Sequence, residues 1–167
     1  MRRVIVSLAA AGTLICQQAA AQLHCMSPAD RAAFDVQALR SEMMVLATGC
    51  SNDTQYNAFI TRYRPELQAN EREIDAWFKK KFGKRAQSEH DRFVTDLANA
   101  QSSAGTKLGS DFCPHNAMIF HQVMALEHAG ELPPFAAGQN LVPTSLDVCA
   151  EETALAEPAR RVASKKH

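Results

Sequence analysis

Hydrophobic residues recur at intervals of three and four along most of this chain, the spacing that places them on one face of an α-helix. The first series follows Ser27-Pro28-Ala29-Asp30, where a serine cap, a proline in the first turn and an early acidic residue are typical of a helix start. Gly49 comes after its last turn and is expected to end it. The apolar positions of this first predicted helix are Ala32, Val36, Leu39, Met43, Leu46 and Ala47.

A second series begins near Asp53 or Thr54 and continues to Phe82, but Pro65 interrupts it. Proline removes a backbone donor inside a helix, so the helix must either kink at this point or divide into two. The apolar series keeps its phase across the proline, and this favours a kink. Its members are Tyr56, Phe59, Ile60, Tyr63, Leu67, Ile74, Trp77, Phe78 and Phe82.

Two further helices are predicted in the second half of the chain. One spans the apolar and small residues between Ala86 and Ala104, whose size permits close packing. The other runs from Ser110 or Asp111 to about His128 and is hydrophobic on two sides, so we expect it in the middle of the fold. The pattern fades after the Leu132-Pro133-Pro134 segment. These four helices predict an all-α protein with an up-down bundle architecture.

The two ends of the chain differ in composition from the part between them. Two arginines, an apolar run over residues 4–15 and Ala19-Ala20-Ala21 are typical of a secretory signal peptide, here residues 1–21. The apolar run is too short for stable membrane insertion. We therefore expect a helical domain over residues 22–149 in a periplasmic or secreted protein. Residues 150–167 are polar and charged, and we expect them to form a disordered tail.

Net charge gives no support for a nucleic acid partner. The chain has 18 basic and 18 acidic side chains, and cleavage of the leader removes two arginines and no acid. Its one dense basic run consists of Lys79, Lys80, Lys81, Lys84 and Arg85. These cations complement the negative end of the second helix, which is the simplest explanation for them. The alternative is a patch for an anionic lipid, a cell-wall polymer or nucleic acid.

Four cysteines remain after the leader, enough for two disulfides in an oxidising compartment. The first helix separates Cys25 from Cys50 by about 30 Å, and a disulfide needs Cα atoms within about 7 Å, so these two do not pair. In an up-down bundle the end of the first helix meets the start of the fourth. This arrangement predicts a Cys50 with Cys113 bridge and a Cys25 with Cys149 bridge, provided that the chain does not fold back at Pro65.

The expected new N-terminus has the arrangement of a metal site. Cleavage after Ala21 would leave Gln22-Leu23-His24, whose amine, two backbone nitrogens and imidazole suit the square-planar geometry of Cu(II) or Ni(II). Cyclisation of the terminal glutamine would remove the amine. His24 is therefore a candidate ligand for copper or nickel.

Catalytic motifs are lacking along the sequence. Its remaining candidates are His90, His121 and His128, which would form an enzyme site only if they converge from different helices. The last two lie about 10 Å apart along one helix and cannot bind one ion alone. Glu71 and Asp75 share a helical face, and we expect them to be surface charges. Each histidine is expected to pack and form hydrogen bonds.

The absence of such motifs favours a non-enzymatic interaction or binding module with an unknown protein partner or a second copy of itself. Phe34, Ala38 and Val45 lie opposite the main apolar face of the first helix, where they would form a partner or dimer face. The alternative to a partner face is that these three are incidental apolar residues on the surface. The alternative function is a copper or nickel protein that uses the mature N-terminus. An enzyme with a site built from histidines is the third possibility.

Overall fold

The computed structural model describes residues 27–143, and this part of the chain is all-α, as predicted. Its three long helices are α1 (Pro28–Cys50), α3 (Arg64–Phe82) and α4 (Ala86–Leu108). The shorter helices are α2 (Asp53–Arg62), α5 (Phe112–Asn116), α6 (Ile119–Met124) and α7 (Leu132–Gln139). Three turns of 3₁₀-helix join them, namely η1 (Gly83–Arg85), η2 (Gly109–Asp111) and η3 (Ala129–Glu131).

Several predictions concern residues outside this range. The signal peptide, the tail over residues 150–167, the metal ligand His24 and the Cys25 with Cys149 bridge all fall outside the described residues. They therefore stay predictions.

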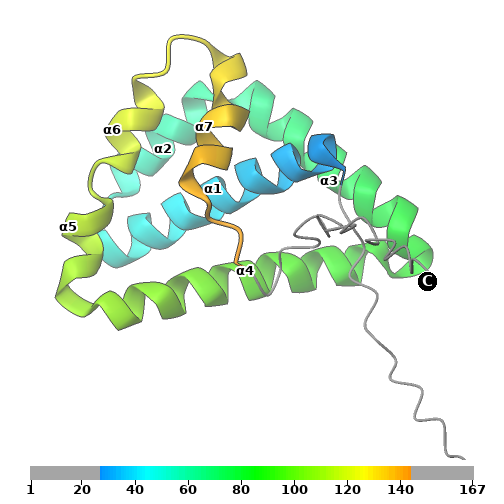
Figure 1. Cartoon of the computed structure of the whole chain (residues 1–167), viewed down its shortest axis with the longest axis horizontal. Helices are drawn as coiled ribbons and strands as arrows, with labels where there is room; N and C mark the ends of the chain where they lie inside the picture. Colours follow the sequence, from blue (N-terminus) through cyan, green and yellow to red (C-terminus); the bar gives the residue numbers. More distant parts are fainter. Residues whose placement is uncertain (1–26, 144–167) are drawn as a thin grey trace, which may run out of the picture.

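The helices are arranged as a triangle (Figure 1), with α4 along one side and α3 along a second. The third side contains α2, α5 and α6, while α1 crosses the interior and α7 lies against it. The central helix is therefore α1, and the prediction that the fourth helix occupies the middle is wrong. Every residue from Ala33 to Leu39 is buried, because α1 is covered from several sides at once.

The start of α1 follows the sequence signals closely. Ser27 Oγ accepts a hydrogen bond from the backbone N–H of Asp30 at 3.2 Å, and the Asp30 carboxylate accepts one from the Ser27 backbone N–H at 3.2 Å. These two bonds form a capping box, with Pro28 in the first turn. The helix continues one residue past Gly49 and ends at Cys50. The next residue, Ser51, adopts the left-handed conformation with φ 58°.

The segment around Pro65 is two helices and not one kinked helix. The chain leaves α2 at Arg62 and enters α3 at Arg64, and Figure 1 shows it changing direction there. Pro65 has no N–H to donate to the carbonyl four residues earlier, which weakens the helix at this point. Tyr63 occupies the junction, and its buried hydroxyl donates a hydrogen bond to the carbonyl of Val123 at 2.6 Å. This contact fixes the junction against α6.

The predicted fourth helix is divided into α5 and α6. At the break the N–H of Ala117 reaches the carbonyl of Pro114 at 3.4 Å, which is a long bond of the 3₁₀ type. A covalent bridge ties α5 to α1, whereas α6 inserts Phe120 and Val123 into the core beside α2. The sequence pattern also missed α7, although its two prolines occupy first-turn positions that need no donor.

The predicted Cys50 with Cys113 disulfide is confirmed, with Cα atoms 5.6 Å apart. The pairing was predicted from helix directions, and these directions are as expected. The chain returns through α2 and α3 to the start of α1, and α4 then leads back to the end of α1 (Figure 1). The bridge joins the last residue of α1 to α5 across a sequence separation of 63 residues. It closes the corner of the triangle that the short helices occupy.

The core has two main parts, and one of them overturns a prediction. Aliphatic and aromatic residues of α1, α2, α6 and α7 form the larger part, while Phe34, Trp77 and Phe78 form an aromatic cluster between α1, α3 and α4. Phe34 is 1% exposed and Ala38 is 0% exposed, and Val45 is partly buried. The predicted partner face is therefore wrong for Phe34 and Ala38, since α3 and α4 cover that side of α1.

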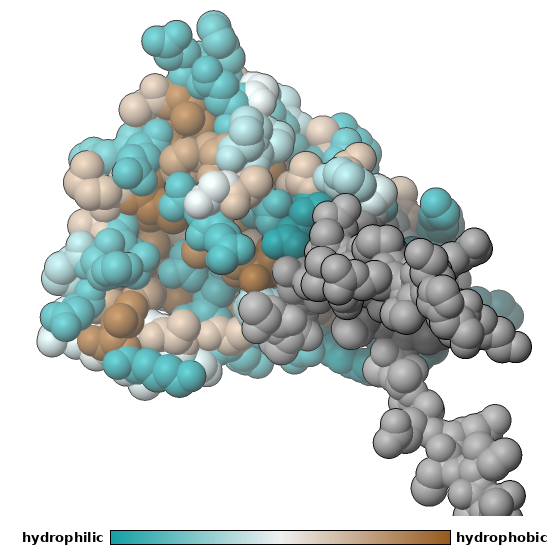
Figure 2. Space-filling model, viewed as in Figure 1, coloured by the Kyte–Doolittle hydropathy of each residue, from teal (hydrophilic) through white to brown (hydrophobic). Residues whose placement is uncertain are grey.

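The outer surface is mostly polar. In Figure 2 hydrophilic residues occupy much of the periphery, and hydrophobic residues gather toward the middle of the face shown and around α7. None of the helices within residues 27–143 has the length and apolar composition needed to cross a bilayer.

Candidate metal centre

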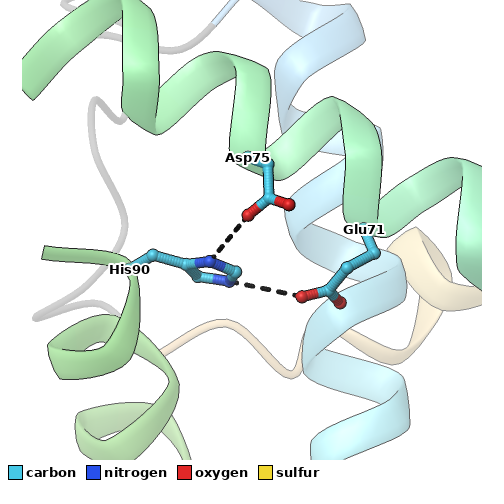
Figure 3. A group of neighbouring side chains, drawn as sticks. All are labelled: Glu71, Asp75 and His90. Carbon is cyan, nitrogen blue, oxygen red and sulfur yellow. Dashed lines mark ion pairs between the residues drawn. The ribbon is translucent and has the colours of Figure 1, made fainter. Parts of the chain in front are cut away.

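Side chains from α3 and α4 converge on one point of the molecule (Figure 3). Glu71 and Asp75 are one turn apart on α3 and therefore share a face, and His90 comes from the second turn of α4. One ligating atom from each of the three residues lies within 4.8 Å of the other two. Oδ1 of Asp75 is 3.0 Å from Nδ1 of His90, and Oε1 of Glu71 is 3.7 Å from its Nε2.

The imidazole is buried, and the two carboxylates reach toward solvent. The side chain of His90 is 8% exposed, whereas those of Glu71 and Asp75 are 39% and 59% exposed. The ring of His90 also stacks on that of Phe78, with centroids 5.0 Å apart and planes inclined by 22°. The ring is therefore held in its plane by the aromatic cluster and approached at its edge by two acids.

The two contacts of the imidazole differ in kind. A separation of 3.0 Å suits a hydrogen bond from Nδ1–H to Asp75, but 3.7 Å is too long for one to Glu71. With the proton on Nδ1, the other nitrogen carries a lone pair. That nitrogen, Nε2, is buried and has no hydrogen-bond partner among the described residues. A lone pair facing a carboxylate is unfavourable unless a cation lies between them.

A zinc ion fits the space between these two atoms. Zinc binds imidazole nitrogen at roughly 2.0 to 2.1 Å and carboxylate oxygen at roughly 2.0 to 2.2 Å, so a tetrahedral site separates the two ligands by about 3.4 Å. The observed 3.7 Å needs only a small closing movement. Asp75 then holds the other ring nitrogen, the arrangement in which a carboxylate orients a metal-binding histidine.

The cluster opens onto a cleft of about 480 Å³ between α1, α3 and α4. Arg40 of α1 lies in its wall, and its Nη1 is 3.1 Å from Oε2 of Glu71. The side-chain oxygens of Gln37 and Ser41 line the same cleft and are also buried without a hydrogen-bond partner among the described residues. Three of the six such atoms among the described residues therefore line this cleft, and the other three belong to Glu66, Trp77 and Gln101 elsewhere. A bound ion or polar ligand would account for the three in the cleft.

The three histidines singled out in the sequence do not come together. His121 is exposed on α6, beside a groove that Gln55 and Met124 line. His128 is exposed before η3 and caps it together with Glu131. These three histidines therefore do not share a site, and among them His90 belongs to a cluster of candidate metal ligands within the described residues.

Glu71 and Asp75 reach the surface, as expected, but His90 was not identified from the sequence as their common neighbour. Asp75 and His90 lie almost equally far in sequence from Gly83, which marks the turn between two helices that run side by side. Such positions meet across an antiparallel helix pair. This symmetry about the turn, combined with the four-residue spacing of the two acids, is the signal that was available in the sequence.

No protein-family model, curated protein or solved structure matches this chain. Its site is therefore defined by its residues, as a cluster of two carboxylates and one imidazole in an all-α scaffold.

Proposed function

We propose that this protein binds a divalent transition-metal ion of the zinc class at Glu71 and His90, with Asp75 orienting the imidazole. The observation that carries the proposal is the buried, unpaired Nε2 of His90, which faces a carboxylate oxygen at 3.7 Å. Imidazole suits zinc, copper, iron and nickel, while an all-oxygen site would favour magnesium or calcium. The mixed ligand set therefore favours zinc and its neighbours.

Charge balance supports the same conclusion. Two carboxylates attract a divalent cation, although Arg40 already offsets the charge of one of them, and the buried imidazole adds a neutral ligand. Arg40 does not block the site, because its hydrogen bond goes to Oε2 of Glu71 and leaves Oε1 facing His90. The guanidinium nevertheless repels the ion and draws electron density from the ligand. Arg40 is therefore expected to lower the affinity.

The ligand count favours reversible binding over a structural role. A structural zinc site has four protein ligands, whereas the cluster offers three ligating side chains at most. The remaining coordination positions face the open cleft, where water or a small molecule can complete them. We infer a protein that takes up and releases the ion and does not need it to fold.

A proton is the competing occupant. On Nε2 it would convert His90 to an imidazolium between two acids, and the cluster would then be an internal ion pair that joins α3 to α4. Metal binding and this ion pair predict opposite results when the folded protein is titrated with zinc. If the cluster is a metal site, zinc displaces the proton, so the affinity for zinc falls as the pH is lowered.

Isothermal titration calorimetry with zinc chloride tests the proposal. We expect one ion per cluster in the full chain, loss of this binding in Glu71→Gln and His90→Leu, and a loss of about 10 to 100-fold in Asp75→Asn. Arg40→Met should bind more tightly, because the competing cation is removed. Glu73→Gln is the matched control, since Glu73 is an exposed acid of α3 outside the cluster.

Equal zinc affinity in Glu71→Gln and Glu73→Gln would contradict the proposal and leave the internal ion pair. The variant His24→Ala distinguishes the predicted N-terminal site from the cluster, because it must leave zinc binding at the cluster unchanged. A Cu(II) or Ni(II) titration that loses one ion only in His24→Ala would support the second site at Gln22-Leu23-His24.

An exported, oxidising environment remains part of the proposal. It rests on the leader pattern of residues 1–21 and is supported by the Cys50 with Cys113 disulfide. We keep the predicted Cys25 with Cys149 bridge, the up-down bundle stapled by two disulfides, and a periplasmic or secreted location. A protein partner or homodimer is compatible with metal binding. Peptide mass spectrometry without reduction, on protein from an exporting host, reads both the cleavage site and the second bridge.

A further inference from the structure

The corner where α3 ends and α4 begins carries the densest charge of the molecule. It contains Lys79, Lys80 and Lys81 in the last turn of α3, followed by Lys84 and Arg85 in η1, and all five side chains are exposed. We call these five residues the basic corner. It forms the right-hand vertex of the triangle in Figure 1.

Little negative charge compensates the basic corner. Glu89 pairs with Arg85 at 3.0 Å and with Arg92 at 3.2 Å. Within residues 27–143, in contrast, no carboxylate forms an ion pair with any of the four lysines of the corner. Because the chain as a whole has equal numbers of basic and acidic residues, this corner makes the molecule electrically asymmetric.

Helix stability accounts for only part of this charge. The three lysines at the end of α3 interact favourably with its negative C-terminal end. Lys84 and Arg85 come immediately before α4, however, and the positive N-terminal end of that helix disfavours cations. Lys84 thus opposes local stability, whereas the ion pair with Glu89 offsets this effect for Arg85, and mutual repulsion adds to the cost of the cluster. An external anion would explain why they are placed together.

Two of the cations are supported by aromatic rings. Nζ of Lys81 is 6.0 Å from the centre of the Trp77 ring, and Cζ of Arg85 is 6.0 Å from that of Phe82. Contacts of this kind attract a cation to the ring face and restrict the side chain. They keep part of the charge at the tip of the corner.

The shape of the corner selects a flat anionic surface. Lys79, Lys80 and Lys81 are consecutive, so successive side chains project about 100° apart around the end of α3. If the end of α3 points at a planar array of phosphates, all three side chains can reach it. If α3 lay along its side, only the lysines on one helix face could do so. Reading of a nucleic acid groove instead needs an element that enters the groove, and the corner is a convex turn.

We propose that the basic corner binds the phosphate headgroups of an anionic lipid bilayer as a peripheral contact. Each lysine or arginine near such a surface strengthens the association roughly fivefold, and salt weakens it. The contact is independent of the metal centre, because none of the five residues belongs to the cluster on α3 and α4. It places the protein at a membrane surface without an inserted segment.

Vesicle sedimentation of the full chain tests this proposal. The variant Lys79→Gln, Lys80→Gln and Lys84→Gln removes three charges and keeps the two aromatic contacts. The control Arg64→Gln, Arg72→Gln and Lys107→Gln removes the same charge at exposed positions outside the corner. We expect binding to phosphatidylcholine vesicles that contain phosphatidylglycerol at low salt, release at high salt, and a loss of about 100-fold in the corner variant. The control should lose far less.

Three results would overturn the proposal. The first is equal loss in the two triple variants, which would show that net charge alone matters. The second is equal binding to vesicles of pure phosphatidylcholine. The third is evidence that the corner binds another anion. Such evidence would be complete displacement by inorganic phosphate at low ionic strength, or tighter binding to double-stranded DNA than to the vesicles.

Discussion

His90 lies flat against Phe78, with ring centroids 5.0 Å apart and planes inclined by 22°. Asp75 sets the rotation of the imidazole through Nδ1, and Phe78 sets its plane. Nε2 is thereby aimed at Glu71. A ligand whose orientation is fixed in advance loses less freedom on binding, so the aromatic cluster contributes to the metal centre although it supplies no ligand.

Replacement of Phe78 by leucine should therefore weaken zinc binding. Phe78→Leu keeps an apolar side chain in the core but removes the ring that stacks on His90. We expect a loss of about tenfold or more in zinc affinity, as for other residues that orient a metal ligand. Calorimetry measures the affinity, and circular dichroism verifies that the variant is folded at the same temperature.

Phe93→Leu is the control for this experiment. Phe93 belongs to the same aromatic cluster and packs against Phe34 and Phe78. It should lose comparable stability but retain nearly the full zinc affinity. Equal loss of affinity in both variants would show that general loosening of the cluster, and not support of the imidazole, is responsible.

Glu42 makes the stability of the protein depend on pH. Glu42 is 6% exposed, and burial raises the pKa of its carboxyl above the ordinary value of 4.5. The folded state therefore holds this proton more tightly than the unfolded state does. The stabilising contribution is fully present below the pKa of the unfolded side chain and is lost as the pH rises through the folded pKa.

Glu42→Gln should consequently be more stable than the parent at pH 7, by about 1.4 kcal/mol for each pKa unit of difference between the two states. The advantage should disappear below about pH 4, where the glutamate is protonated in the unfolded chain as well. Thermal unfolding at several pH values measures the difference. A pH-independent effect of the substitution at position 42 would contradict the explanation.

The Cys50 with Cys113 disulfide should stabilise the domain by about 2 to 4 kcal/mol, mainly through its effect on the unfolded chain. The double variant Cys50→Ser and Cys113→Ser removes it, and urea unfolding measures the loss. Any further loss when the double variant is reduced reports the predicted Cys25 with Cys149 bridge. A double variant as stable as the oxidised parent would show that the corner between α1 and α5 is held by packing alone.

The sequence predicted the helices that carry both a regular apolar spacing and clear end signals. It placed α1 correctly for that reason, and the apolar spacing alone placed α4, which continues to Leu108. The Cys50 with Cys113 bridge within the described residues followed from helix lengths. Prediction from the sequence failed where tertiary contacts decide the outcome. Tyr63 stabilises a complete break because its hydroxyl finds Val123, a partner 60 residues away. Nothing in the local spacing indicates that contact.

The same limit explains how the site was missed. Periodicity assigns a residue to a helix face but does not identify the neighbour that faces it, so the convergence of Glu71 and Asp75 on His90 was not predicted. The side of α1 opposite its main apolar face was taken as exposed for the same reason, although α3 and α4 cover Phe34 and Ala38. In each case the missing information is which helices are adjacent.

Close contact between α4 and α5 makes Gly105 a position where one methyl group matters. A Cβ at this residue would lie 2.8 Å from Cε2 of Phe112 and about 3.0 Å from two further atoms of the same ring. The ring itself lies beside Gly49 near the end of α1. Phe112 is thus confined between two glycines at the corner that the disulfide closes.

Gly105→Ala should therefore destabilise the protein by about 1 to 3 kcal/mol, the usual cost of overpacking, even though alanine favours a helix by roughly 1 kcal/mol over glycine. The double variant Gly105→Ala and Phe112→Leu should recover part of the loss relative to Phe112→Leu alone, because the smaller side chain leaves room for the methyl group. Urea unfolding of the four proteins measures this coupling. If Gly105→Ala stabilises the protein in both backgrounds, the helix preference exceeds the steric conflict and the ring has room to move.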